Sequence, residues 1–277
     1  MLSRVKQTDP FQEPAAWDVE TARQWAEILD LRASNPDQML LRRELLNAAN
    51  LRPGDTAVEI GCGTGVLLAE LAEAVGPTGS VVGVEPQPVF AEAARRRLAQ
   101  RGLGGSAEVH NRDAQLLPLG DATADACVAQ TVLVHIPDAA AVLAEMCRVV
   151  RRGGRVASID QDGDTTVIDH PDRELTRRLV RFSSDHRFAD GWTGRRLPRM
   201  FRAAGLTDMQ VTVRTHVDTE PGSFLHGIAL RLAESAMEAG AVGENEGSRW
   251  LAQLAELADA GSFFSSINYY LCVGARA

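Results

Sequence analysis

Short apolar runs alternate with helical patterns over residues 56–160. The runs are apolar nearly throughout, which is typical of parallel strands covered by helices on both faces. Strands are predicted at 56–60, 80–85, 107–110, 126–130 and 155–160, and helices between them at 66–75, 89–100 and 139–150. The alternation predicts an α/β protein with a doubly wound, mostly parallel sheet.

The N-terminal region has a helical pattern without strands. Apolar residues fall at helical spacing over 17–31 and again over 36–50. Asn35, Pro36 and Asp37 form a helix start, because proline suits the first helical position and an acid suits the positive end of the helix dipole. We therefore expect residues 1–50 to form a helical extension that is a candidate lid.

The second half of the chain mixes helices with two long strands. Helices are predicted at 171–188, 197–204, 224–238 and 248–258, and strands at 209–217 and 262–273. We expect one main domain over 51–277, with a helical insertion at 221–260 before a last strand that is antiparallel to the others.

Composition narrows the class of protein. Apolar residues make up 45% of the 277-residue chain and charged residues 24%, as in ordinary globular proteins. The net charge of −8 argues against a nucleic-acid partner, because such proteins usually present a basic surface. Residues 1–14 lack the core of a signal peptide, and no apolar run approaches the ~20 residues of a membrane span. We expect a cytoplasmic protein without a membrane span.

The residue types that usually hold metals form no metal-binding pattern. The four cysteines make neither a CxxC pair nor a Cys/His cluster. Asp160, Asp162 and Asp164 match the start of a calcium loop, but the later glutamate of that loop is absent. No metal is expected.

The strongest motif is a glycine-rich turn after the first predicted strand. Gly61, Gly63 and Gly65 follow the strand and precede a helix, where glycines let the backbone approach a ligand closely. In a doubly wound sheet, ligands bind beyond the carboxyl ends of the strands. Glu85 ends the next strand, where a carboxylate can accept both hydroxyl protons of a ribose.

A dinucleotide such as NAD is the first alternative for this turn. Two residues argue against it. Glu59 precedes the glycines by two positions and would repel a pyrophosphate, whereas a sulfonium or an ammonium group would be attracted. The last glycine of the dinucleotide pattern is replaced by Val66.

The segment from Glu59 to Gly65 resembles the first motif of class I S-adenosylmethionine (SAM)-dependent methyltransferases, in their small-molecule branch of UbiE-like proteins. The resemblance covers roughly residues 55–160, and further matches follow Glu85 in order along the chain. The matching segments are Arg112–Ala114 with Leu117–Pro118, Val132–Asp138 and Arg148–Arg155. The resemblance implies a Rossmann-like fold with a seven-stranded sheet.

The resemblance also implies the site. SAM would be the cofactor and methyl donor, and Glu85 would hold its ribose with Pro86 beside it. Asp113 and Ala114 would lie at the adenine, and Gln130 at the methionine part of SAM. The remaining cofactor-binding residues would be Glu59, Gly61, Cys62, Gly63 and Gly65.

The implied reaction is in-line transfer of the methyl group to an oxygen, nitrogen or carbon atom of a small-molecule substrate. Two alternatives stay open: a SAM-binding enzyme without methyl transfer, such as a cyclase, and an NAD-dependent oxidoreductase. A nucleic-acid base methyltransferase is disfavoured, because Gln130 and Thr131 stand where such enzymes carry an Asn/Asp-Pro-Pro segment. A homodimer is possible.

Two residues are candidates for proton transfer. His135 follows the fourth predicted strand and is either a general base or a structural residue that packs under the cofactor. Asp160 ends the fifth predicted strand and either contacts the substrate as a base or caps a loop. Arg195 and Arg196 are candidates for binding a substrate anion, or for surface ion pairs.

Overall fold

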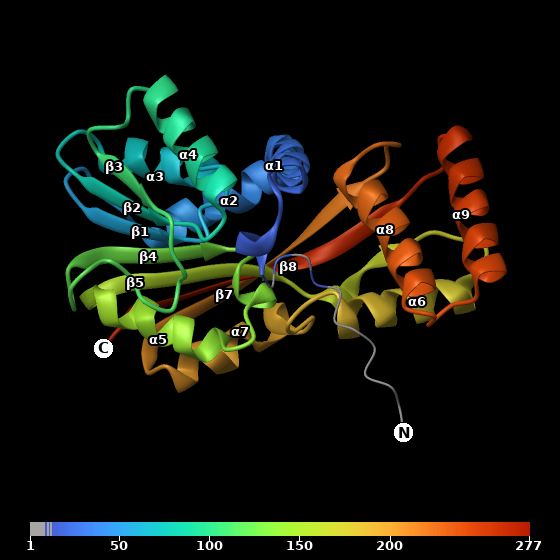
Figure 1. Cartoon of the computed structure of the whole chain (residues 1–277). Helices are drawn as coiled ribbons and strands as arrows, with labels where there is room; N and C mark the ends of the chain where they lie inside the picture. Colours follow the sequence, from blue (N-terminus) through green and yellow to red (C-terminus); the bar gives the residue numbers. More distant parts are fainter. Residues whose placement is uncertain (1–8, 10, 12) are drawn as a thin grey trace.

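The computed structural model describes Asp9, Phe11 and residues 13–277 of the chain. The described residues form one sheet of eight strands, with the order β3-β2-β1-β4-β5-β8-β6 and with β7 paired to β8 (Figure 1). The strands are β1 (Thr56–Ile60), β2 (Ser80–Val84), β3 (Ala107–His110), β4 (Ala124–Gln130), β5 (Val150–Gln161), β6 (Val167–Ile168), β7 (Leu206–Asp218) and β8 (Ser265–Arg276). Neighbouring strands from β3 to β5 are parallel, whereas β8 is antiparallel to β5, β6 and β7.

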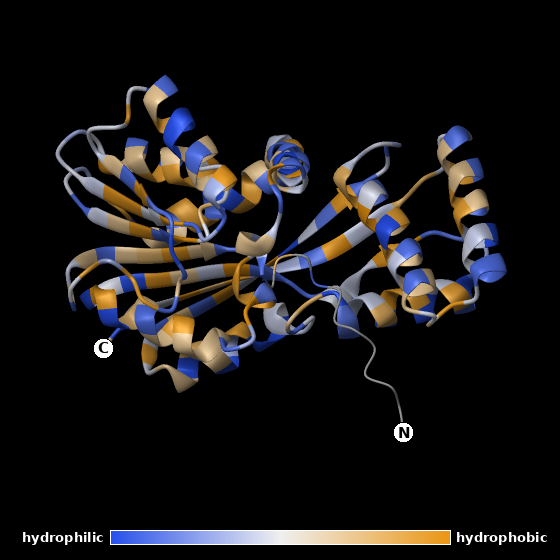
Figure 2. Ribbon diagram, viewed as in Figure 1, coloured by the Kyte–Doolittle hydropathy of each residue, from blue (hydrophilic) through white to orange (hydrophobic). Residues whose placement is uncertain are grey.

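Helices cover both faces of the parallel part of the sheet (Figure 1). One face packs against α2 (Pro36–Ala49), α3 (Val66–Val75) and α4 (Pro88–Gln100), and the other against α5 (Ala139–Val149) and α7 (Thr193–Ala203). Figure 2 shows the result as strands with mostly hydrophobic residues between helices with hydrophilic outer surfaces. Burial on both faces explains why the strand sequences are apolar throughout.

A third hydrophobic cluster lies at the far end of the long β7–β8 pair (Figure 1). It joins α6 (Arg173–His186), α8 (Phe224–Glu238) and α9 (Glu244–Asp259) around the fully buried Trp250. We call these three helices the helical cap. The chain thus has a sheet part and a cap part, connected by β7 and β8.

Side-chain caps fix where several helices begin. Asp18 accepts a hydrogen bond from the Thr21 amide at 2.7 Å and starts α1 (Val19–Ser34). Asn35 accepts one from the Asp37 amide at 2.8 Å and starts α2 with Pro36 at its first position, as the sequence predicted. Such caps satisfy backbone amides that the helix itself leaves free. Three short 3₁₀ helices complete the structure: η1 (Pro14–Ala16), η2 (Leu133–His135) and η3 (Gly163–Thr165).

The predicted fold class is confirmed, with one strand more than the expected seven. The additional strand, β6, has two residues, and its only sequence signal is the pair of apolar residues that form it. Helix α7 begins at Thr193, earlier than the predicted Leu197. Gly194 and Pro198 are poor helix formers. The helix nevertheless packs so closely on the sheet that a Cβ at Gly194 would lie 2.8 Å from the Tyr270 ring, so tertiary packing outweighs the low helix propensity of this residue.

Candidate functional site

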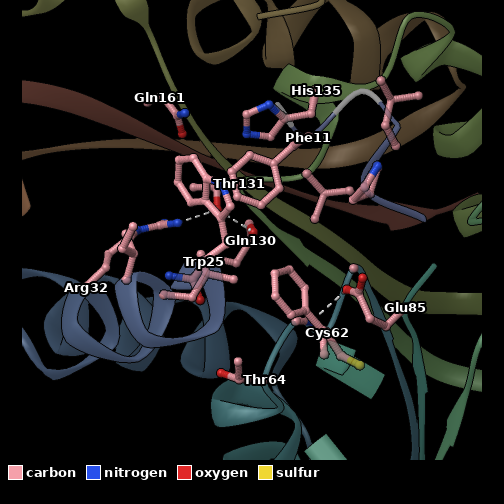
Figure 3. A pocket seen from close by; sticks show the side chains of 18 of the residues that line it. Phe11, Trp25, Arg32, Cys62, Thr64, Glu85, Gln130, Thr131, His135 and Gln161 are labelled. Atoms are coloured by element: carbon pink, nitrogen blue, oxygen red, sulfur yellow. Dashed lines mark hydrogen bonds between the residues drawn. The ribbon is translucent and has the colours of Figure 1, made fainter. Parts of the chain in front are cut away.

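A cavity of about 660 Å³ lies between the glycine-rich turn, the N-terminal segment (Phe11 and residues 13–16) with α1, and helices α6 and α8 of the cap (Figure 3). The predicted residues that line it are Glu59, Gly61, Cys62, Gly63, Glu85, Pro86, Asp113, Ala114, Gln130 and His135. Its volume is in the range of small-molecule and cofactor sites. The parallel strand ends and the cap therefore contribute to the same cavity.

The glycine-rich turn requires glycine at its two ends. Gly61 has φ +62°, and a Cβ there would lie 2.6 Å from Val132 Cγ2. Gly65 has φ +81°, and a Cβ there would lie 2.8 Å from the Ala94 Cα. Side chains rarely adopt these φ values, and both positions lack space for one. The turn therefore brings bare backbone to the cavity at Gly61 and packs closely on α4 at Gly65.

Backbone amides hold Glu85 in place at the end of β2. Its two carboxylate oxygens accept hydrogen bonds of 2.9 Å from the Gly63 and Gln87 amides. Burial nevertheless raises the pKa of the Glu85 carboxyl from its ordinary value to about 7, and the two amides only partly offset the lost hydration. The carboxylate faces the cavity with its remaining lone pairs available to a ligand.

Glu59 is buried beneath the turn with part of its carboxyl group unpaired. Its Oε2 has no hydrogen-bond partner among the described residues. Burial raises the pKa of Glu59 well above its ordinary value, the nearby Glu70 and Glu85 raise it further, and Arg42 partly opposes them. A cationic group entering the cavity would stabilise the ionised form of this carboxyl.

The adjoining predicted residues line the same region. Asn111 donates hydrogen bonds of 2.8 and 2.9 Å to the carbonyls of Glu85 and Pro86, which fixes the chain after β2. Asp113 accepts a hydrogen bond of 2.8 Å from the Gln115 amide, and Ala114 is buried beside it. The segment that follows β3 thus presents one exposed carboxylate, that of Asp113, and one small apolar side chain, that of Ala114, to the cavity.

Arg32 of α1 is a cavity residue that the sequence analysis missed. Its Nη1 donates to Thr131 Oγ1 at 2.9 Å and its Nε to Gln38 Oε1 at 3.2 Å (Figure 3). Its Nη2 is buried and has no partner among the described residues. Thr131 follows Gln130 directly and has φ +55°, which turns the chain at the end of β4. Arg32 therefore places a guanidinium at the end of β4, with its Nη2 unpaired among the described residues.

His135 is paired with the N-terminal segment. Its Nδ1 lies 3.0 and 3.1 Å from the two carboxylate oxygens of Asp9, whose side chain is fully buried. The His135 ring also lies beside the Phe11 ring (Figure 3), with ring centres 5.0 Å apart, and 5.7 Å from the ring centre of Phe188. An aspartate at Nδ1 fixes the tautomer that keeps the lone pair on Nε2.

Two predicted residues lie behind the cavity wall. Gly65 begins α3 and packs on α4. Asp160 is fully buried, and its carboxylate accepts hydrogen bonds from the Val134 amide at 3.1 Å and from Ser158 Oγ at 2.8 Å. Burial raises the pKa of Asp160 to about 6, although these hydrogen bonds lower it. Its hydrogen bonds are with its own strand and with the segment that carries His135, and it does not line the cavity.

Within the part of the chain that the structure describes, no helix is long and apolar enough to cross a membrane. The same residues contain no group of three or more histidine, cysteine, aspartate or glutamate side chains placed to hold a metal ion.

The chain is similar in sequence to known proteins. A family model described as a methyltransferase domain matches residues 57–154. An uncharacterised 37.1 kDa protein of transposon TN4556 from Streptomyces fradiae is 35% identical over 88% of this chain and 69% of its own length. A demethylmenaquinone methyltransferase from Geobacillus sp. (strain WCH70) is 28% identical over 61% of this chain and 78% of its own.

The solved structure of geranyl diphosphate C-methyltransferase from Streptomyces coelicolor A3(2) superposes with a TM-score of 0.55. It covers 87% of this chain and 79% of its own at 16% identity, which is a likeness of fold. The chain belongs to the class I SAM-dependent methyltransferases. SAM is its cofactor, and neither alternative, the cyclase nor the NAD-dependent oxidoreductase, is favoured.

Proposed function

We propose that the enzyme methylates a small-molecule acceptor that binds between the helical cap and the strand ends that carry Glu59, Gly61, Gly63 and Glu85, which we call the glycine-rich edge. The cavity itself is the observation that supports this most, because one continuous space joins the strand ends to aromatic residues of the N-terminal segment and the cap. Relatives and neighbours named for methylating demethylmenaquinone and geranyl diphosphate support a small-molecule acceptor. The net charge of −8 supports it over a nucleic acid.

The residues at the glycine-rich edge fit SAM. Glu85 is held by two amides so that its carboxylate can accept the ribose hydroxyl protons. The unpaired Oε2 of Glu59 suits the ammonium group, and the unpaired Nη2 of Arg32 suits the carboxylate of the methionine part. Asp113 and Ala114 would hold the adenine. SAM supplies an electrophilic methyl group, so the protein's task is to position the acceptor and exclude water.

His135 is the proposed general base. A methyl group that joins an oxygen, nitrogen or carbon atom bearing hydrogen displaces a proton, and that proton needs an acceptor. Asp9 holds Nδ1 of His135, which leaves Nε2 as the basic atom. The proton would pass from the substrate to Nε2, and the Asp9 carboxylate would stabilise the resulting imidazolium.

Asp160 is proposed to act as a positioning residue. It accepts from the Val134 amide, and Val134 precedes His135 in η2. Its carboxylate therefore fixes the backbone of the segment that carries the base. It would influence the reaction through His135 and not through contact with the substrate.

The proposal can be tested with SAM that carries a deuterated methyl group. The purified protein is incubated with this SAM and a fractionated extract of small molecules, and methylated products are found by mass spectrometry. We expect a labelled product with the wild-type protein, none with Glu85→Ala, and about 100-fold slower formation with His135→Ala. Arg181→Ala is the matched control, because Arg181 is an exposed residue of α6.

Separate binding experiments keep the outcomes distinct. S-adenosylhomocysteine (SAH), the product of SAM after methyl transfer, should bind to the wild-type protein and to His135→Ala with similar affinity. Label found only in protein or nucleic acid would refute the small-molecule acceptor. Unchanged rates in His135→Ala would refute the role of His135 and leave the cofactor assignment intact.

A further inference from the structure

Arg187 is a buried cation without a counter-ion in contact. It ends α6, lines the cavity and is only 8% exposed. Its Nε is buried without a partner, and no hydrogen bond or ion pair of its guanidinium occurs among residues 9, 11 and 13–277. Burial lowers the pKa of Arg187 to about 10, and the nearby Arg231 adds to this effect. An unpaired buried charge is costly, so such an arginine needs an explanation.

The two arginines that the sequence offered for anion binding are satisfied by acids. Arg195 forms a two-pronged ion pair with the buried Asp162, and Arg196 pairs with Asp190. These two residues, which the sequence offered as anion-binding candidates, are therefore neutralised by the protein itself. Arg187 differs from them because its guanidinium has no such partner.

The nearest acids do not neutralise Arg187 by contact. Asp9 and Glu234 are close enough to raise its pKa somewhat. However, the Asp9 carboxylate is engaged by His135 Nδ1 at 3.0 Å and by the Phe11 amide at 2.9 Å. Arg187 thus retains hydrogen-bonding capacity toward the cavity.

Further polar groups line the cavity around the same end of the sheet. Gln161 at the end of β5 has a buried Oε1 without a partner among the described residues. Thr166 and Ser183 also line the cavity, and Ser183 lies one helical turn before Arg187. Aromatic rings of Phe188, Phe224 and Tyr269 complete this part of the wall. This part of the cavity therefore combines polar groups with an aromatic wall.

We propose that Arg187 binds an oxyanion of the methyl acceptor, either a carboxylate or a phosphate. The guanidinium fork matches the geometry of either group and would gain the partner that the described residues do not provide. This inference rests on the proposed function, since it takes the cavity to receive an acceptor. The acceptor is then an anionic molecule with an apolar or aromatic body.

The anionic end of the acceptor would lie close to the proposed base. The amides of Ala189 and Asp190 both donate to the Val134 carbonyl, at 3.1 and 3.2 Å, so the segment after Arg187 is bound to the segment before His135. The Phe188 ring also contacts the His135 ring at 5.7 Å. A compact acceptor, with its anionic group only a few atoms from the methylated atom, fits this arrangement.

A matched set of ligands tests the inference in the SAH-bound protein. The probes are 3-phenylpropionate, phenethyl phosphate and the neutral 3-phenylpropionamide, titrated by calorimetry. We expect at least one anionic probe to bind about tenfold more tightly than the amide. The preference should vanish in Arg187→Met and persist in Arg187→Lys, while Arg181→Met, on the same helix, should behave as wild type. Whichever anion binds more tightly identifies the carboxylate or the phosphate as the better match.

Thermal unfolding of the ligand-free protein gives a second readout. Met keeps the apolar stem of Arg187 but removes its unpaired charge, so Arg187→Met should raise Tm by about 2–4 °C. A structural arginine would give a lower Tm instead. Equal binding of the three probes, no binding of either anion up to about 10 mM, or an anion preference that survives Arg187→Met would each overturn the inference. Failure of SAH to bind would count against the proposed function instead.

Discussion

The glycine-rich edge and the helical cap form the same cavity by different means. At the glycine-rich edge, backbone amides of Gly63 and Gln87 hold Glu85, so the key carboxylate is fixed by main-chain geometry. At the cap side, Arg187 and Gln161 carry buried polar atoms that no described residue satisfies. In the first region main-chain amides fix Glu85, although Glu59 Oε2 beneath the turn is also unpaired among the described residues, whereas the groups that the second region offers are side chains.

This difference suits two ligands of different kinds. A cofactor with a fixed structure is best bound by rigid backbone that costs no reorganisation. In the proposed function, the acceptor would be selected by side chains on elements that are stabilised elsewhere, here by the separate hydrophobic cluster of the cap. The comparison predicts that damage to one region leaves binding in the other largely intact.

The largest expected effect comes from the centre of the cap. Trp250 is fully buried, its Nε1 donates to Thr176 Oγ1 at 2.9 Å, and its ring stacks on His170. Trp250→Ala should lower the free energy of unfolding by about 3–5 kcal/mol, measured by urea denaturation. SAH affinity of the folded variant should stay within about twofold of wild type.

Arg181→Ala is the control for this substitution, because the Arg181 side chain is exposed and its loss should cost little. A large loss of SAH affinity in folded Trp250→Ala would show that the two regions are one cooperative unit. The comparison between a prebuilt edge and an independent cap would then be wrong.

The next effect is expected at the glycine-rich edge. Glu85→Ala removes the carboxylate that would accept two ribose hydroxyl protons, so SAH should bind about 100- to 1,000-fold more weakly by calorimetry. Stability should change far less than in Trp250→Ala. Glu92→Ala, an exposed position on α4, is the control and should bind SAH normally. Retained affinity in Glu85→Ala would remove the basis for the ribose assignment.

The sequence predicted these two regions unequally, for a physical reason. Uniformly apolar strands, a glycine-rich turn and an acid at the next strand end are local signals, and the structure has each of them. The contacts of Arg32 with Thr131 and of Asp9 with His135 join residues 99 and 126 positions apart. Such contacts depend on how elements dock, which composition and periodicity do not encode.

Helix α7 and Asp160 show the same limit. The start of α7 contains Gly194, a poor helix former that packs closely on the Tyr270 ring. Asp160 stands at a strand end, where many functional carboxylates occur, yet its partners are Ser158 and the Val134 amide. The position of Asp160 at a strand end predicted which segments it lies near. Its burial and its hydrogen bonds determine where its carboxylate points.

A smaller effect is expected at Arg32, a cavity residue that no local sequence signal predicted. If its free Nη2 holds the methionine carboxylate, Arg32→Met should weaken SAH binding about ten- to thirtyfold. Adenosine lacks the methionine part, so its affinity should be unchanged, and Arg23→Met on the exposed face of α1 should affect neither ligand. Equal losses for adenosine and SAH would mean that Arg32 supports the site in general.

The smallest effect expected is a pH dependence that belongs to the glycine-rich edge alone. Burial raises the pKa of Glu85 to about 7 in the free protein, and ribose hydroxyls that donate to the carboxylate favour its ionised form. Ligand binding therefore lowers this pKa, and affinity is complete above pH 7 and lost as the pH falls through it. Adenosine, titrated from pH 8 to pH 6, should bind about tenfold more weakly at the lower pH. Glu85→Gln should bind it weakly at both pH values and with a flat profile. An adenosine affinity that rises toward pH 6 in the wild-type protein would mean that the neutral carboxyl of Glu85 binds the ribose. The amides of the glycine-rich edge would then not hold Glu85 as an anion for this contact.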